Sequence, residues 1–149
     1  MKYLLTIALS IFILPVYASE FSLKQIGKIV REEKINFPNG SKFITFKHEG
    51  GFESSNGKYG KYQCKGNILY NKENILEDMN FACEFIDQNE DKYIAMGKRS
   101  KGSEIDRAVG AAIIVDGVGF WKDYIGYLCK YAIEYVGDVI FAPTNCKKG

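Results

Sequence analysis

Histidine is almost absent from this sequence, in which His48 is the only one. The four cysteines, at positions 64, 83, 129 and 146, form no C-x-x-C pair. Structural zinc sites are usually built from such pairs together with histidines. The sequence therefore predicts neither a metal site nor a cofactor. Any catalytic arrangement that needs an imidazole must use His48.

The sequence also has little net charge and no long hydrophobic run. Its 20 lysine and arginine residues nearly balance 18 aspartate and glutamate residues, which leaves a formal net charge of +2. A nucleic-acid partner is not predicted, because such proteins carry a strongly basic surface. The predominantly apolar run from Leu4 to Leu14 is shorter than the roughly 20 residues that span a bilayer, and Pro15 follows it. Stable membrane insertion is accordingly not predicted.

The same N-terminal segment has the pattern of a secretory signal peptide. Lys2 precedes the apolar run, and Val16-Tyr17-Ala18 places small or apolar residues at a cleavage site. Cleavage after Ala18 would remove residues 1–18 and leave residues 19–149 as a single domain. We therefore expect a periplasmic or secreted protein, and a retained membrane anchor is the alternative.

The beginning of the expected domain has the pattern of a short helix. Ser22 and Gln25 resemble a capping box, and Leu23, Ile26 and Ile29 recur at helical spacing, which predicts an amphipathic helix over residues 22–34. From residue 44 onwards the apolar period changes to two. Strands are therefore expected at 44–52, 61–70, 79–85, 92–98 and 107–115, and in a hairpin at the C-terminus.

The turns between these strands fix their registers. The loop Ser55–Gly57 suits a three-residue hairpin that places His48 opposite Cys64. A turn centred between residues 73 and 74 then places Cys64 opposite Cys83. Four cysteines in an exported chain favour disulfides, with three connectivities available. This register selects the Cys64–Cys83 pair.

The C-terminal hairpin gives an independent test of that pairing. Gly137-Asp138 suits a two-residue turn, and its register places Cys129 opposite Cys146. We therefore predict the disulfides Cys64–Cys83 and Cys129–Cys146.

The remaining strand pattern predicts the architecture. The segment 107–115 has no polar face after its first residue, and we expect it to be covered on both sides. Seven or eight short strands with tight turns favour an all-β fold. The expected form is a closed or nearly closed antiparallel barrel of about eight strands, with the N-terminal helix outside it.

The segment Asp116 to Tyr127, DGVGFWKDYIGY, is rich in glycine and aromatic residues. It resembles the turn before the last strands of the allene oxide cyclase and dirigent type of eight-stranded barrel, over about residues 107–136. It also resembles short exported bacterial proteins of unknown role. The resemblance implies that apolar small molecules bind at or inside the barrel, and it carries over no catalytic residue. A dinucleotide loop is excluded, because Lys122 stands where the third glycine belongs.

Several aromatic residues fall on the inward faces of the predicted strands. His48 shares this face, either as a hydrogen-bonded core residue or as a group that contacts a ligand or acts as acid or base. Glu49, Glu53 and Glu84 fall on the water-facing side, so no catalytic carboxylate pair is predicted. The candidate ligand-binding residues are Phe46, His48, Tyr62, Phe85 and Tyr131.

The first functional hypothesis is a non-enzymatic, exported binding protein for a small apolar or aromatic ligand. Its pocket should measure roughly 300 Å³ or more. One alternative is an isomerase or cyclase of the resembling superfamily. Another is an envelope or secreted interaction domain with a packed barrel and a functional outer surface, which a smaller pocket would favour. The oligomeric state is left open.

Overall fold

A computed structural model describes residues 20–99 and 107–149, so the predicted signal peptide lies outside the described residues. The described chain is all β apart from one short 3₁₀ helix. It contains no helix that is long and apolar enough to cross a membrane. The elements are β1 (Glu20–Asn36), β2 (Lys42–Ser54), β3 (Tyr59–Tyr70), β4 (Leu76–Asp87), β5 (Lys92–Arg99), β6 (Arg107–Gly117), the 3₁₀ helix η1 (Gly119–Tyr124), β7 (Tyr127–Val136), β8 (Val139–Phe141) and β9 (Thr144–Lys148).

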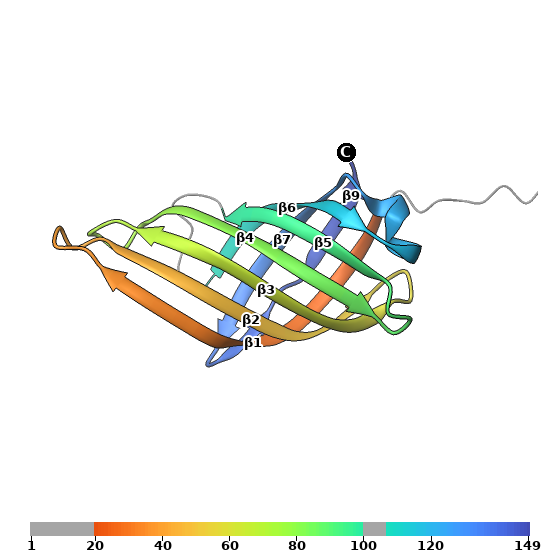
Figure 1. The fold of residues 1–149 in the computed structure, drawn as a ribbon, viewed down its shortest axis with the longest axis horizontal. Helices are drawn as coiled ribbons and strands as arrows, with labels where there is room; N and C mark the ends of the chain where they lie inside the picture. The colour runs from red at the N-terminus through yellow and green to blue at the C-terminus, as the bar shows by residue number, and fades with distance from the viewer. Residues whose placement is uncertain (1–19, 100–106) are drawn as a thin grey trace, which may run out of the picture.

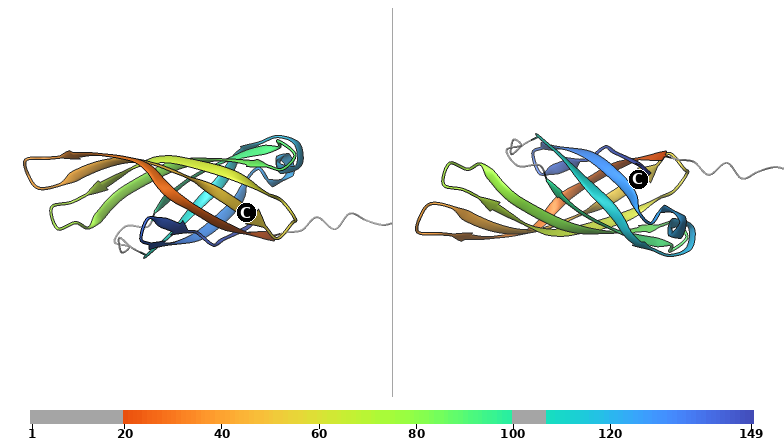
Figure 2. Two further views of the ribbon diagram at one scale, coloured as in Figure 1. Left: turned by 90° about the horizontal axis from the view of Figure 1, so that it is seen from below. Right: turned by 90° about the horizontal axis from the view of Figure 1, so that it is seen from above.

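The nine strands pair antiparallel in a ring (Figures 1 and 2). Each strand from β2 to β6 pairs with the next one along the chain, and β7 pairs with both β8 and β9. Both of these short strands pair with β1, which in turn pairs with β2. The predicted final strand is interrupted between Phe141 and Thr144, where Pro143 has no N–H to donate. The prediction of an antiparallel all-β fold is confirmed.

The predicted N-terminal helix is wrong, because residues 20–36 form the long strand β1. Phe21 and Leu23 are buried, whereas Ile26 is 55% exposed, so the burial follows a period of two. A helix of this length is marginal by itself. Pairing with β2 along almost the whole strand supplies backbone hydrogen bonds that override the local helical pattern.

The predicted hairpin registers are confirmed. His48 lies opposite Cys64, Cys64 lies opposite Cys83, and Cys129 lies opposite Cys146. Both predicted disulfides are formed. Two disulfides are compatible with an oxidising location such as the periplasm or the cell exterior.

The expectation that residues 107–115 are covered on both sides is wrong. Ala112 and Ile114 point inward and are buried, but Val109 is 60% exposed and Ile113 is 43% exposed. The outer face of β6 is exposed because the N-terminal segment, which the sequence pattern predicts to cover the ring as a helix, is itself a strand of the ring.

One end of the ring is closed by η1 (Figure 1). Trp121 is fully buried there, with its ring centroid 4.5 Å from that of Tyr93 and 5.8 Å from that of Phe21. Its indole N–H donates to the Asp87 carboxylate over 3.1 Å. Lys58 Nζ, on a half-buried side chain, lies 3.1 Å from the same oxygen, so this ion pair helps to fix the position of the indole.

Asp87 is the acceptor at the centre of this closure. Burial of its carboxyl raises its pKa, but the backbone N–H of Asn89, the Lys58 ammonium and the backbone N–H of Asp91 outweigh that effect. The pKa of Asp87 is therefore held below its ordinary value, and the carboxylate is charged at neutral pH.

The hairpins β1–β2 and β3–β4 extend beyond the opposite end of the ring (Figures 1 and 2). They project because β1 pairs with β8 only as far as Lys28, and β4 pairs with β5 only from Asn80 onwards. A second apolar core lies along this extension and consists of Ile44, Phe46, Tyr70, Leu76 and Met79.

Replacing Asp87 with asparagine should lower the free energy of unfolding by about 3 kcal/mol, because the Lys58 ammonium, on a side chain that is only 11% exposed, then loses its counter-charge. Chemical denaturation at pH 7 measures this change. The matched control is Asp123→Asn, an exposed position in η1, which should change stability by less than about 0.5 kcal/mol.

The stability of Asp87→Asn should also depend on acid differently from that of the native protein. In the native protein, stability that is present above about pH 4 is lost as the pH falls and protonates the Asp87 carboxylate. Asp87→Asn should lack this part of the acid dependence. An unchanged acid transition would show that Asp87 does not support the closure.

The interior cavity as candidate functional site

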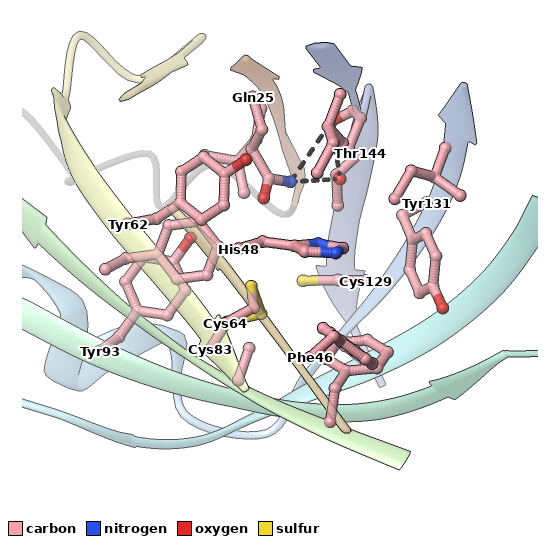
Figure 3. A pocket seen from close by; sticks show the side chains of 18 of the residues that line it. Gln25, Phe46, His48, Tyr62, Cys64, Cys83, Tyr93, Cys129, Tyr131 and Thr144 are labelled. Atoms are coloured by element: carbon pink, nitrogen blue, oxygen red, sulfur yellow. Dashed lines mark hydrogen bonds between the residues drawn. A yellow bond between two sulfur atoms is a disulfide. The ribbon is translucent and has the colours of Figure 1, made fainter. Parts of the chain in front are cut away.

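The inward faces of the strands line a cavity of about 80 Å³ (Figure 3). All five predicted ligand-binding residues lie in its wall, although their binding role stays a prediction. The volume is smaller than the roughly 300 Å³ expected of a ligand pocket. The predicted residues in the wall are Phe46, His48, Tyr62, Phe85 and Tyr131, and the others are Leu23, Gln25, Cys64, Met79, Phe81, Cys83, Tyr93, Ala95, Ala112, Cys129, Ile133, Ile140, Ala142 and Thr144.

One wall of the cavity is a row of aromatic rings set by strand register. Tyr62 lies opposite Phe85, and Phe85 lies opposite Tyr93 on the next strand. Their ring centroids are 5.6 Å and 4.5 Å apart, and both pairs are stacked. Tyr93 also packs against Trp121, so the row connects the cavity to the closed end of the ring.

His48 projects into the cavity from β2 (Figure 3). It is 7% exposed, and its ring centroid lies 4.6 Å from that of Phe46 and 6.4 Å from that of Tyr135. Burial lowers the pKa of His48 to about 4. The imidazole is therefore neutral at pH 7 and has one donor nitrogen and one acceptor nitrogen. Among the described residues neither nitrogen has a hydrogen-bond partner.

Tyr93 presents a second polar group to the same cavity (Figure 3). Its side chain is 1% exposed, and within the described part of the chain its hydroxyl has no hydrogen-bond partner. Burial raises the pKa of this phenol well above its ordinary value, so it stays protonated. A buried hydroxyl without a partner costs about 1–3 kcal/mol.

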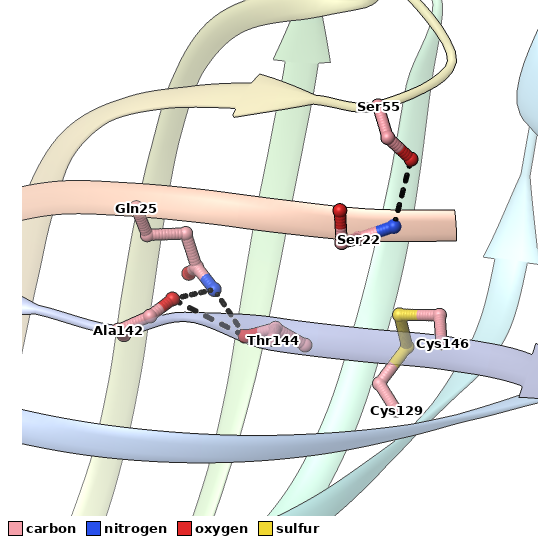
Figure 4. Close-up of a disulfide and its surroundings, with 7 residues drawn as sticks. All are labelled: Ser22, Gln25, Ser55, Cys129, Ala142, Thr144 and Cys146. Atoms are coloured by element: carbon pink, nitrogen blue, oxygen red, sulfur yellow. Dashed lines mark hydrogen bonds between the residues drawn. A yellow bond between two sulfur atoms is a disulfide. The ribbon is translucent and has the colours of Figure 1, made fainter. Parts of the chain in front are cut away.

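Gln25 and Thr144 form a polar pair in another part of the wall. Gln25 Nε2 donates to Thr144 Oγ1 over 2.9 Å and to the Ala142 carbonyl over 3.3 Å (Figures 3 and 4). The Ala142 N–H in turn donates to the backbone carbonyl of Gln25 over 3.0 Å. These bonds bridge the interruption between β8 and β9. The Cys129–Cys146 disulfide and the hydrogen bond from Ser22 N to Ser55 Oγ hold the ring nearby (Figure 4).

The cavity wall contains no charged side chain. Burial raises the pKa of Tyr62 to about 12, and it also raises the pKa of Tyr131, whose hydroxyl donates to the Lys98 carbonyl over 3.2 Å. The predicted water-facing carboxylates are not in this wall. Glu49 pairs with Lys47 over 2.7 Å, and Glu84 accepts a hydrogen bond from Gln63. The described residues also contain no cluster that could hold a metal ion.

Sequence reasoning missed Tyr93, Gln25 and Thr144. The sequence pattern predicts a helix cap at Gln25, and Thr144 follows an irregular strand break. A signal for Tyr93 does exist in the turn between Asp87 and Asp91. Pairing these two aspartates places Tyr93 opposite Phe85 on the inward face.

We expect the imidazole of His48 to remain neutral well below pH 6.5. The unfolded chain gains a proton near pH 6.5, but the folded chain does so only near pH 4. Stability should therefore fall by roughly 3 kcal/mol as the pH drops through this window. His48→Gln should remove that loss. Because His48 is the only histidine, an NMR titration of its imidazole nitrogen signals measures this pKa without overlap from other residues. A titration midpoint near pH 6.5 would contradict the burial argument.

Comparisons with protein families, curated proteins and solved structures gave no match to this chain. The resemblance to the allene oxide cyclase and dirigent barrels therefore stays a prediction.

Proposed function

We propose that this chain is an exported, non-enzymatic binding protein in which the ring acts as a barrel that holds one small apolar or aromatic ligand. The observation that supports the proposal is the interior cavity, which His48 lines and where the buried Tyr93 hydroxyl has no hydrogen-bond partner among the described residues. Its wall is mostly apolar, as in most small-molecule sites.

The cavity volume limits the ligand. An apolar cavity of about 150 Å³ is large enough for benzene, and this one measures about 80 Å³. The ligand is therefore either smaller than benzene or needs some widening of the site. Met79 supplies a route for widening, because its unbranched thioether lines the cavity and adapts readily.

The walls support binding because they are held in place before a ligand enters. The Cys64–Cys83 disulfide joins β3 to β4, and the Cys129–Cys146 disulfide joins β7 to β9. A site that is already ordered loses little conformational entropy on binding.

The isomerase or cyclase alternative has less support. A general acid or base works best with a pKa near the operating pH. Burial lowers the pKa of His48 to about 4 and raises the pKa of Tyr62 to about 12, so both values lie far from neutral pH. Among the residues of the wall there is no carboxylate to raise the pKa of His48 and no cation to lower the pKa of Tyr62.

Filling the cavity should abolish binding. Ala112→Leu places a larger side chain inside, whereas Ala111→Leu, the next residue of β6, adds the same atoms to the outer face and is the matched control. A thermal shift screen of small neutral metabolites, with xenon and benzene as probes, provides the measurement. A ligand at 100 times its dissociation constant should stabilise the native protein and the Ala111→Leu variant by about 2.7 kcal/mol, but not Ala112→Leu.

A second candidate function is a protein-interaction domain. A groove of about 550 Å³, lined by residues of β3 to β7, lies at Gly97 beside the exposed side chains of Met96 and Ile113. Exposed apolar patches of this kind often mark interaction sites. The small volume of the interior cavity also favours this function.

The interaction candidate predicts a contact that depends on the outer face. Replacing Val109 and Ile113 with threonine keeps the β propensity but removes apolar surface. Crosslinking in the native compartment, with sedimentation to detect self-association, should recover a complex with the native protein and with Ala112→Leu but not with the double variant. Equal recovery with all three proteins would reject this face.

A further inference from the structure

Two polar side chains project into the cavity in positions that they cannot easily leave. The ring of Tyr93 is stacked on Phe85 at a centroid distance of 4.5 Å and an interplanar angle of 3°, and Trp121 packs on it at 4.5 Å. His48 is held beside Phe46 and lies opposite a disulfide-bonded cysteine. The Tyr93 hydroxyl cannot reach bulk water without disrupting this packing, and the His48 side chain is 7% exposed. Buried polar groups without partners are exceptions that need an explanation.

The electrostatics of the wall restrict what can provide those partners. A charged ligand would lose its hydration without meeting a counter-charge, because no charged side chain lines the cavity. The buried Asp87 and the half-buried Lys58 are not in the wall, and they neutralise each other. Arg99 is buried as well, but it is not in the wall and has interaction partners of its own.

A purely apolar ligand is also disfavoured. It would leave both the His48 imidazole and the Tyr93 hydroxyl unpaired, which costs free energy for each group. A ligand hydroxyl can donate to the acceptor nitrogen of a neutral imidazole and accept from a phenol, and a carbonyl can accept from both.

Resting on the proposed binding function, we infer that the ligand is an uncharged, mainly apolar molecule with one hydroxyl or carbonyl group, which hydrogen-bonds to both His48 and Tyr93. These two residues then select the ligand by its polar group, and the surrounding rings select it by size. Ligands that lack such a group are discriminated against because the two buried groups remain unpaired.

The test compares probes of similar size and different charge. Isobutanol is the neutral hydroxyl probe, isobutyrate is the anion, isobutylammonium is the cation, and xenon is the apolar probe. Binding is measured by thermal shift and by the NMR signal of His48, which is the only histidine. Isobutanol should bind at least tenfold more tightly than either ion and should perturb the His48 signal.

The variants separate recognition from structural support. Tyr93→Phe removes a hydroxyl that has no partner, so the ligand-free variant should melt at a higher temperature, while its affinity for isobutanol falls about tenfold and its affinity for xenon does not. Tyr59→Phe is the control, because Tyr59 is 60% exposed and lies outside the cavity wall. That variant should keep the preference for isobutanol.

The outcomes distinguish this inference from the proposed function. If xenon binds inside but isobutanol binds no more tightly, or if Tyr93→Phe leaves the preference unchanged, the inference is wrong and the binding function stands. A lower melting temperature for Tyr93→Phe would also overturn it, because the hydroxyl would then have a structural partner. If no probe binds and Ala112→Leu responds like the native protein to all of them, the binding function itself is wrong.

Discussion

The pairing of β1 along both of its edges is the constraint on which the rest of the structure depends. The first half of this strand bonds to β2 on one side and to β8 and β9 on the other. Gly27 lies opposite Gly50 at this point, and a Cβ at Gly27 would overlap the Tyr62 hydroxyl. Glycine therefore lets the inward phenol pass close to the backbone where the ring closes.

Ring closure also explains why the interior holds a cavity with unpaired polar groups. Tyr62 begins the aromatic row that continues through Phe85 and Tyr93 to Trp121, and Asp87 fixes the indole at its far end. Each ring is positioned by strand register or by a buried hydrogen bond. The wall therefore cannot shift to give the Tyr93 hydroxyl a partner, and the cost remains localised at the cavity.

The parts of the fold that could be predicted are those determined by period-two patterns and turn residues. The turn at residues 55–57 places His48 opposite Cys64, and the turn centred between residues 73 and 74 places Cys64 opposite Cys83. The turn after Val136 places Cys129 opposite Cys146. The strand β1 could not be predicted in this way, because its residues also match a helical spacing and only its distant partners decide between the two. The cavity volume could not be predicted from the sequence either, because it depends on how rings from several strands pack together.

The small residues in the cavity wall bear on function. Ala95 and Ala112 face inward from neighbouring strands, and larger side chains at these positions would fill the space and bury more apolar surface. Phenylalanine at position 93 would remove an unpaired hydroxyl. Stability alone would therefore favour a filled, apolar interior, and this chain departs from it in three ways at one place: an open volume, a neutral imidazole and a free phenol. These features coincide at a single site, and the ligand that we propose would restore the missing contacts there.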